Sequence, residues 1–127
     1  MKIGRPGTSK HAVLGLMRGL IPNIVSLDPP VPIRVNAIAP GWTESGIVRR
    51  ALFESVGIVV QSADVPARSA VLLMADKKRQ GELIYSCEGK LKEIENGVLL
   101  KTAREVVLGG REDGDGDVLR KAMELLK

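Results

Sequence analysis

The first periodic stretch of the chain covers residues 8–20. Its apolar positions recur three and four residues apart, as on one face of a helix, and they are Val13, Leu16, Met17 and Leu20. Thr8 or Ser9 can cap the first turn, because each carries a hydroxyl oxygen that accepts a backbone N–H. Pro22 lacks a backbone N–H, so we expect this helix to kink or end near Ile21.

Two later stretches have the pattern of strands, at residues 33–39 and 83–87. The first alternates apolar and mixed positions until Pro40 stops it. Between the two strands, residues 62–78 are predicted as a helix with Ser62 as its N-cap. Because a strand, a crossover helix and a second strand form a βαβ unit, the two strands are predicted to be parallel.

The remaining segments are less regular. Residues 41–61 are predicted as a long excursion that is partly helical over 46–56, and residues 89–108 as a hairpin-like turn followed by a short helix. Residues 109–127 are predicted as a flexible Gly/Asp linker with a short amphipathic helix. We therefore expect a first domain at 1–108 and a linker-helix segment at 109–127.

Composition narrows the class of protein. The chain has 127 residues, of which 44% are hydrophobic and 27% charged, and this fits one small globular domain. No apolar run approaches the roughly 18 residues that a membrane helix needs, and no signal peptide is recognised, so a cytoplasmic setting is expected. The net charge of +4 is spread along the chain and the aromatic content is 2%, so no nucleic-acid partner is expected.

No metal site is expected either. The single Cys87 and the single His11 are too few for a zinc site built on these residues. Four acidic residues approach the spacing of a calcium loop, and they are Asp113, Asp115, Asp117 and Glu124. That loop needs glycine where Val118 stands here, so an acidic linker whose Asp117 caps the last helix is favoured.

Three blocks of the sequence together carry a family resemblance: GTSKHAVLGLMRGL, then IRVNAIAPGWTES, then GELIYSCEGKLKEIENGVL. In this order and spacing they resemble the short-chain dehydrogenase/reductase family, in the manner of its fungal members. The resemblance covers only the C-terminal half of such an enzyme. It implies an α/β fold of partial Rossmann-like type, the C-terminal half of a doubly wound parallel sheet, ordered helix–strand–helix–strand with a C-terminal helical tail.

The resemblance also implies site residues. The family's Tyr-x-x-x-Lys motif lies on the helix predicted at 8–20, where Lys10 matches the lysine and Pro6 stands at the tyrosine. Lys10 is therefore the implied catalytic residue. The implied cofactor contacts are Lys10 and the turn after the first strand, with Pro40, Gly41, Trp42, Thr43 and Ser45. The only tyrosine, Tyr85, matches a structural position of the family.

The implied function is that of an NAD- or NADP-dependent oxidoreductase acting on a small-molecule alcohol or ketone, as in secondary metabolism. This sequence has neither the family's glycine-rich phosphate cradle nor its proton-donating tyrosine. We therefore expect a truncated enzyme that is not catalytically competent as it stands. The alternative is a non-catalytic interaction module that pairs with full-length relatives as a homo- or hetero-oligomer.

Overall fold

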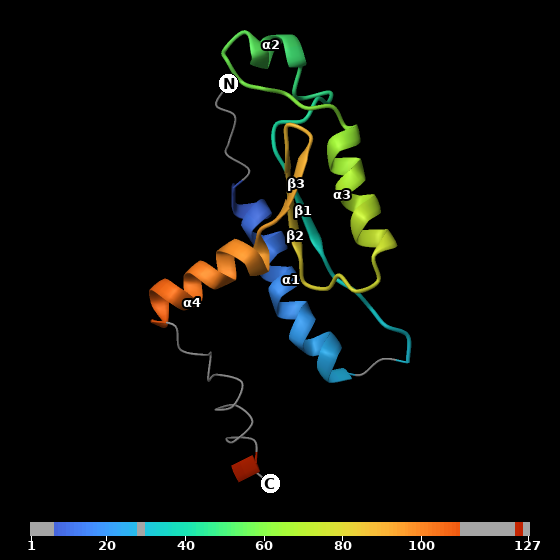
Figure 1. Ribbon diagram of the computed structural model, residues 1–127, viewed down its shortest axis with the longest axis vertical. Coiled ribbons are helices and arrows are strands. Elements are labelled where there is room, and N and C mark those ends of the chain that lie inside the picture. Colours follow the sequence, from blue (N-terminus) through green and yellow to red (C-terminus); the bar gives the residue numbers. More distant parts are fainter. Residues whose placement is uncertain (1–6, 28–29, 110–123, 126–127) are drawn as a thin grey trace. The chain divides into compact units, whose positions relative to one another are not determined.

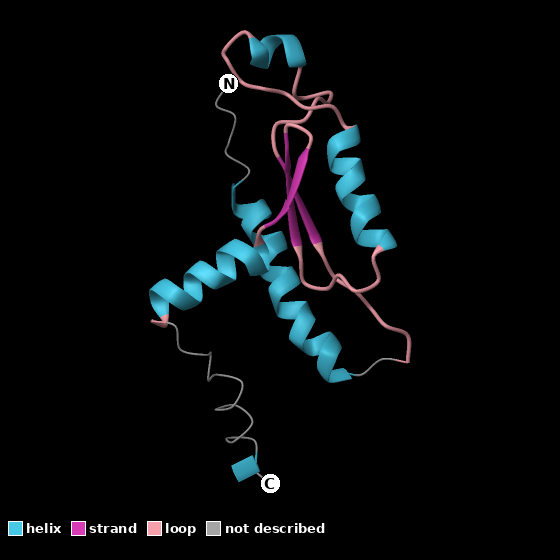
Figure 2. Ribbon diagram, in the orientation of Figure 1, coloured by secondary structure: helices cyan, strands magenta, loops and turns pink. Residues whose placement is uncertain are grey.

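The computed structural model describes residues 7–27, 30–109 and 124–125. Its elements, shown in Figures 1 and 2, are α1 (Gly7–Leu27), β1 (Ala37–Pro40), α2 (Arg50–Glu54), α3 (Asp64–Ala75), β2 (Leu83–Cys87), β3 (Lys90–Glu93), the π-helical segment η1 (Glu95–Leu100) and α4 (Lys101–Val107). The chain divides into two compact units, Met1–Glu95 and Asn96–Lys127. The sheet and the sequence-predicted site residues all lie in the first unit.

The sheet has three strands in the order β1-β2-β3. β1 and β2 are parallel, with Ala37 opposite Leu83, and this confirms the predicted βαβ unit. β3 is antiparallel to β2, with Lys92 opposite Tyr85. The fold is therefore α/β, as predicted, and consistent with a partial Rossmann-like sheet, while β3 adds a strand at the position predicted as a hairpin-like turn.

The core of the first unit is small and lies between the sheet and two helices. α1 and α3 lie on opposite sides of the sheet in Figure 1. The buried apolar side chains come from α1, the loop before α3, α3 itself and β2, and they are Met17, Val60, Val65, Leu73, Leu83 and Ile84. Ile84 is only 1% exposed, so the centre of β2 anchors this core.

The predicted first helix was too short. α1 begins at Gly7, so Thr8 and Ser9 lie inside the helix rather than at its cap, and it continues past Pro22 to Leu27. Next to the proline, the Asn23 side-chain amide donates a hydrogen bond to the carbonyl of Gly19 at 2.7 Å, one turn earlier. This bond helps to hold together the turn in which Pro22 supplies no N–H.

The predicted bounds of the first strand and the second helix were also wrong. β1 begins at Ala37 instead of residue 33, because the polar side chains before it bind carbonyls at the end of α3 and in the loop after it. α3 begins at Asp64 with Ala63 at the N-cap, so Ser62 precedes the cap. It ends at Ala75 because Asp76 has an extended backbone. The helix predicted over 46–56 is confined to the short α2.

Some predictions fall outside the described residues. Pro6, the acidic residues at 113–117 and most of the predicted last helix lie there. The domain boundary between residues 108 and 109 stays a prediction.

Candidate functional site

The amino-terminal turns of α1 face β1, the first strand of the sheet. A pocket of about 420 Å³ lies between these elements. Its lining comes from α1 (Lys10, His11, Val13 and Leu14), from the whole of β1 (Ala37 to Pro40) and from Leu83 of β2. Small-ligand sites in proteins usually have about 300–1,000 Å³ and mostly apolar walls with a few polar groups, and this pocket fits that description.

Two of the sequence-predicted site residues meet at this pocket. Lys10 lines it from α1 and Pro40 from the end of β1, although 30 positions separate them in the sequence. Lys10 can meet β1 here because α1 packs along the sheet with Met17, which is 3% exposed. The carboxyl end of a parallel strand is where open α/β sheets bind ligands, and Pro40 lies at that edge, while the pocket also extends along β1 to Ala37 and Leu83.

The turn after β1 holds the other predicted cofactor contacts, which are not among the described residues that line the pocket. The Gly41 N–H donates to the carbonyl of Ser86 at 2.7 Å, and a Cβ at Gly41 would lie 3.2 Å from the Cys87 sulfur. Glycine therefore lets this turn pack closely against β2. The Thr43 hydroxyl donates to the Gly41 carbonyl at 2.9 Å.

Ser45 and Trp42 are held by contacts of their own. The Ser45 hydroxyl oxygen accepts the N–H groups of Ile47 at 3.3 Å and Val48 at 3.1 Å, so it closes a local turn. The Trp42 ring lies 5.0 Å from that of Phe53, although the tryptophan side chain is 54% exposed. This pair attaches α2 to the start of the turn.

Tyr85 is the one phenol in the chain, and it does not line the pocket. It lies on β2 opposite Ala39, is 40% exposed and faces Lys92 of β3 across the sheet. A hydrogen bond with the Cys87 side chain, followed by the electrostatic effects of that thiol, raises the pKa of Tyr85.

Two buried polar residues were not predicted from the sequence. Gln61, which is 7% exposed, donates from its amide to the Thr43 hydroxyl and to the Ser86 carbonyl, each at 3.1 Å. Glu95, which is 1% exposed, binds the Arg18 guanidinium through two bonds of 2.5 and 3.0 Å. This hydrogen bond raises the pKa of Arg18. The only sequence signal for Gln61 is a polar residue directly after the apolar run 56–60.

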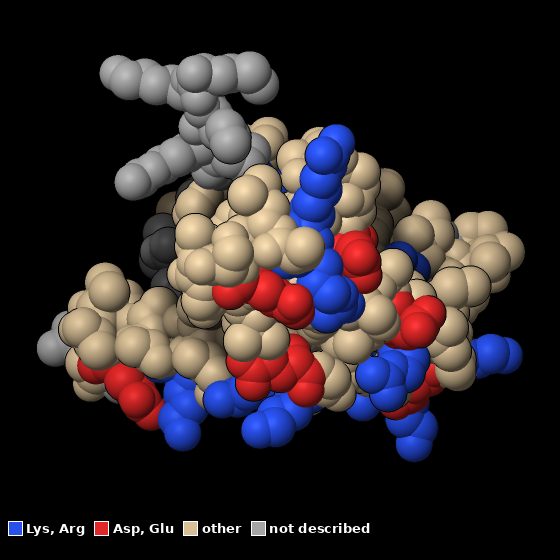
Figure 3. All heavy atoms as spheres, turned by 90° about the horizontal axis from the view of Figure 1, so that it is seen from above, with Lys and Arg blue, Asp and Glu red and all other residues tan. Residues whose placement is uncertain are grey.

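The described residues show no second kind of functional site. Basic and acidic side chains are interleaved on the face seen in Figure 3, without a continuous area of one sign. Within the described part of the chain, no three potential metal ligands gather. No helix among the described residues is long and apolar enough to cross a membrane.

The chain is 35% identical over 122 residues to the short-chain dehydrogenase/reductase ascJ of Acremonium egyptiacum. The match covers 94% of this chain and 40% of that protein, so the chain spans less than half the length of this relative. No family model matches the chain, and no solved structure matches it. The resemblance carried by the three sequence blocks is thereby confirmed, and the partial coverage is consistent with a C-terminal portion.

Proposed function

We propose, because this chain is 35% identical to a short-chain dehydrogenase/reductase over 94% of its length, that its pocket is the nicotinamide end of an NAD(P)-dependent oxidoreductase site. One observation carries the proposal: Lys10 lines the same pocket as Pro40, which ends the parallel strand β1 at its carboxyl end. Bound there, the cofactor would exchange a hydride with an alcohol or ketone carbon.

The residues around the pocket suit the ribose and nicotinamide better than a whole dinucleotide. The Lys10 ammonium supplies hydrogen-bond donors for a ribose hydroxyl, and the apolar walls from Leu14, Ala39 and Leu83 suit a flat ring. Directly after Pro40, the hydrogen bond from the Gly41 N–H to the Ser86 carbonyl fixes the position of the turn relative to the pocket. The sequence has no glycine-rich turn for the pyrophosphate, so this chain supplies one part of a cofactor site.

Proton transfer is the step for which this chain has no matching residue. Proline stands at position 6, where the family has its acid, and a proline side chain has no proton to give. Tyr85 does not line the pocket and lies on β2 opposite Ala39. We propose that the chain binds the nicotinamide end of the cofactor without completing the reaction by itself.

The test is a titration of the isotope-labelled full chain with NADH, NADPH and reduced nicotinamide mononucleotide, followed by NMR. We expect amide shifts in residues 10–14 and 37–39, and about a tenfold weaker affinity in Lys10→Met, since a charge-assisted hydrogen bond is worth about 1.5–3 kcal/mol. Lys77→Met is the control, because it removes the same charge from an exposed residue outside the pocket. Shifts centred elsewhere, or equal affinities of both variants, would refute the proposal.

A second candidate function is supported by the outer face of α1. Its apolar residues Leu16 and Leu20 are 62% and 38% exposed, so part of the apolar stripe predicted for this helix lies uncovered. On this reading the chain is an interaction module that binds a full-length relative. Mixing it with the Acremonium relative should then give a mixed complex in size-exclusion chromatography with light scattering. Leu16→Glu should abolish that complex, and Val31→Glu, an equally exposed loop residue, should not.

A further inference from the structure

Three segments meet at the carboxyl ends of β1 and β2. An isolated parallel bridge joins Thr43 to Gln61. Its backbone bonds run from the Gln61 N–H to the Trp42 carbonyl at 2.9 Å and from the Glu44 N–H to the Gln61 carbonyl at 3.0 Å. Gln61 therefore connects the two ends of the long segment between β1 and α3.

The Gln61 side chain adds a second connection, from this base to β2. Its amide nitrogen donates both to the Thr43 hydroxyl oxygen and to the carbonyl of Ser86, at 3.1 Å each. The same Ser86 carbonyl accepts the Gly41 N–H, and the Thr43 hydroxyl donates to the Gly41 carbonyl. One buried amide thus links the Thr43 side chain to β2, while the Thr43 hydroxyl itself bonds the backbone of Gly41.

The amide oxygen of Gln61 has no hydrogen-bond partner among the described residues, although it is fully buried. An unpaired buried acceptor costs free energy that offsets much of what two neutral hydrogen bonds contribute. If Gln61 lost its amide, the Thr43 hydroxyl would still donate to the Gly41 carbonyl, and the Ser86 carbonyl would still accept the Gly41 N–H. The amide therefore contributes little to net stability and much to the orientation of Thr43.

We propose that Gln61 is a positioning residue for the cofactor-contacting turn, acting through Thr43. The proposal rests on the proposed function for its consequence, because Thr43 belongs to the turn that the resemblance assigns to the cofactor. The ordering of the turn itself does not depend on any ligand. The two parts can therefore be tested separately.

The first test measures order in the full chain without ligand. Gln61→Met keeps the side-chain volume and removes the amide. Gln80→Met is the matched control, because the Gln80 amide oxygen accepts the Val35 N–H at the opposite end of the sheet. We expect hydrogen exchange at the Gly41 and Glu44 amides to be about tenfold faster in Gln61→Met and unchanged in Gln80→Met. The melting temperature of Gln61→Met should fall by less than about 3 °C. Unchanged exchange at both amides overturns the proposal.

The second test is a double-mutant cycle with Thr43→Val. If Gln61 acts through the Thr43 hydroxyl, Gln61→Met should accelerate exchange at Gly41 when threonine is present at position 43. The same change should have less than about a twofold effect in a chain that already carries Thr43→Val. Additive effects of the two changes overturn the role assigned to Thr43. A general loosening of the fold would give such additivity.

The third test adds reduced nicotinamide mononucleotide and follows the indole N–H of Trp42, the single tryptophan. If the wild-type chain binds, Gln61→Met should weaken binding about tenfold and Gln80→Met should leave it unchanged. Equal affinities of the two variants overturn the positioning role. If the wild-type chain fails to bind while Gln61→Met still accelerates exchange, the proposed function fails and the ordering of the turn by Gln61 stands.

Discussion

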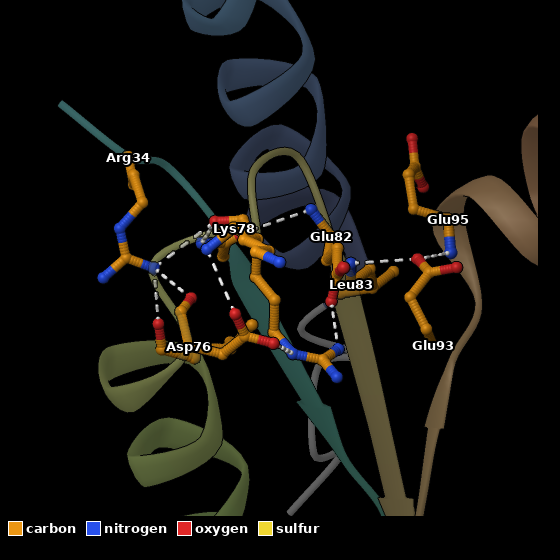
Figure 4. Close-up of polar contacts among 10 residues, drawn as sticks. Arg34, Asp76, Lys78, Glu82, Leu83, Glu93 and Glu95 are labelled. Carbon is orange, nitrogen blue, oxygen red and sulfur yellow. Dashed lines mark hydrogen bonds and ion pairs between the residues drawn. The ribbon is translucent and has the colours of Figure 1, made fainter. Parts of the chain in front are cut away.

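The two ends of the parallel strand pair differ in how completely their polar groups are hydrogen-bonded. At the amino ends of β1 and β2, Arg34 donates from one guanidinium nitrogen to the carbonyls of Leu73 at 2.6 Å and Asp76 at 2.9 Å, where α3 ends (Figure 4). Asn36 accepts the Glu82 N–H at 2.9 Å. These bonds from charged and amide side chains tie the start of β1 to the loop that leads into β2, so they set the register of the pair.

At the carboxyl ends, the described residues leave polar groups unpaired. The Gln61 amide oxygen and the Ser86 hydroxyl are buried without a hydrogen-bond partner there. Pro40 borders the pocket at this end, and the pocket continues along β1 to Ala37 and Leu83. The amino ends therefore carry a network of satisfied hydrogen bonds, whereas the carboxyl ends carry the buried groups that lack a partner among the described residues.

Breaking the ion pair near the amino ends should have the largest effect on stability. Figure 4 shows Glu95 beside Glu93, whose carboxylate accepts the Leu83 N–H at 3.4 Å and the Glu95 N–H at 2.7 Å. Arg18→Met leaves the buried Glu95 carboxylate without its cation. We expect the free energy of unfolding to fall by about 3 kcal/mol, at the low end for a buried pair, because the Arg18 side chain is 45% exposed.

Urea titration followed by circular dichroism measures this change. Arg68→Met is the control, since Arg68 is an exposed arginine of α3 with the same charge. A loss below about 1 kcal/mol for Arg18→Met would place this pair with ordinary surface ion pairs and remove the contrast between the two ends.

Removing an unpaired group at the carboxyl ends should have the opposite sign. Ser86 is 0% exposed and its hydroxyl has no partner among the described residues, so Ser86→Ala should leave stability unchanged or raise it by up to about 1 kcal/mol. Ser69→Ala is the matched control. Ser69 is equally buried but donates to the Val65 carbonyl at 3.5 Å, so its loss should cost about 0.5 kcal/mol. Thermal unfolding of both variants side by side measures the difference, and a larger loss in Ser86→Ala contradicts the expectation.

The same contrast explains how far the sequence predicts the fold. β2 has the predicted bounds because an apolar run between Gly81 and Gly89 specifies a strand locally. β1 starts four residues later than predicted, because Arg34 and Asn36 find their partners about 40 positions away in the loop after α3. Local alternation of apolar residues carries no information about such distant partners.

Prediction of the site had a similar limit. Lys10 and Pro40 were singled out by their resemblance to a family motif, and the pocket brings them together. Gln61 belongs to no motif, and its role depends on the Thr43 hydroxyl and the Ser86 carbonyl, which only the fold places beside it. Local patterns in this sequence therefore miss residues such as Gln61, which orient other site residues without lining the pocket themselves.

The smallest expected effect concerns Tyr85, which lies on β2 between the two ends. Its hydrogen bond with Cys87 raises its pKa, so the phenol in the folded chain loses its proton above its ordinary value of about 10. A group whose pKa is raised by folding contributes stability that is present below the unfolded pKa and is lost as the pH rises through the folded one.

Because Tyr85 is the single tyrosine, absorbance at 295 nm reports its titration alone. Cys87→Ala should move the midpoint back toward 10, and Cys87→Ser, which keeps a hydrogen-bonding side chain, should move it less. Identical midpoints in the wild type and Cys87→Ala would show that the thiol does not act on the phenol.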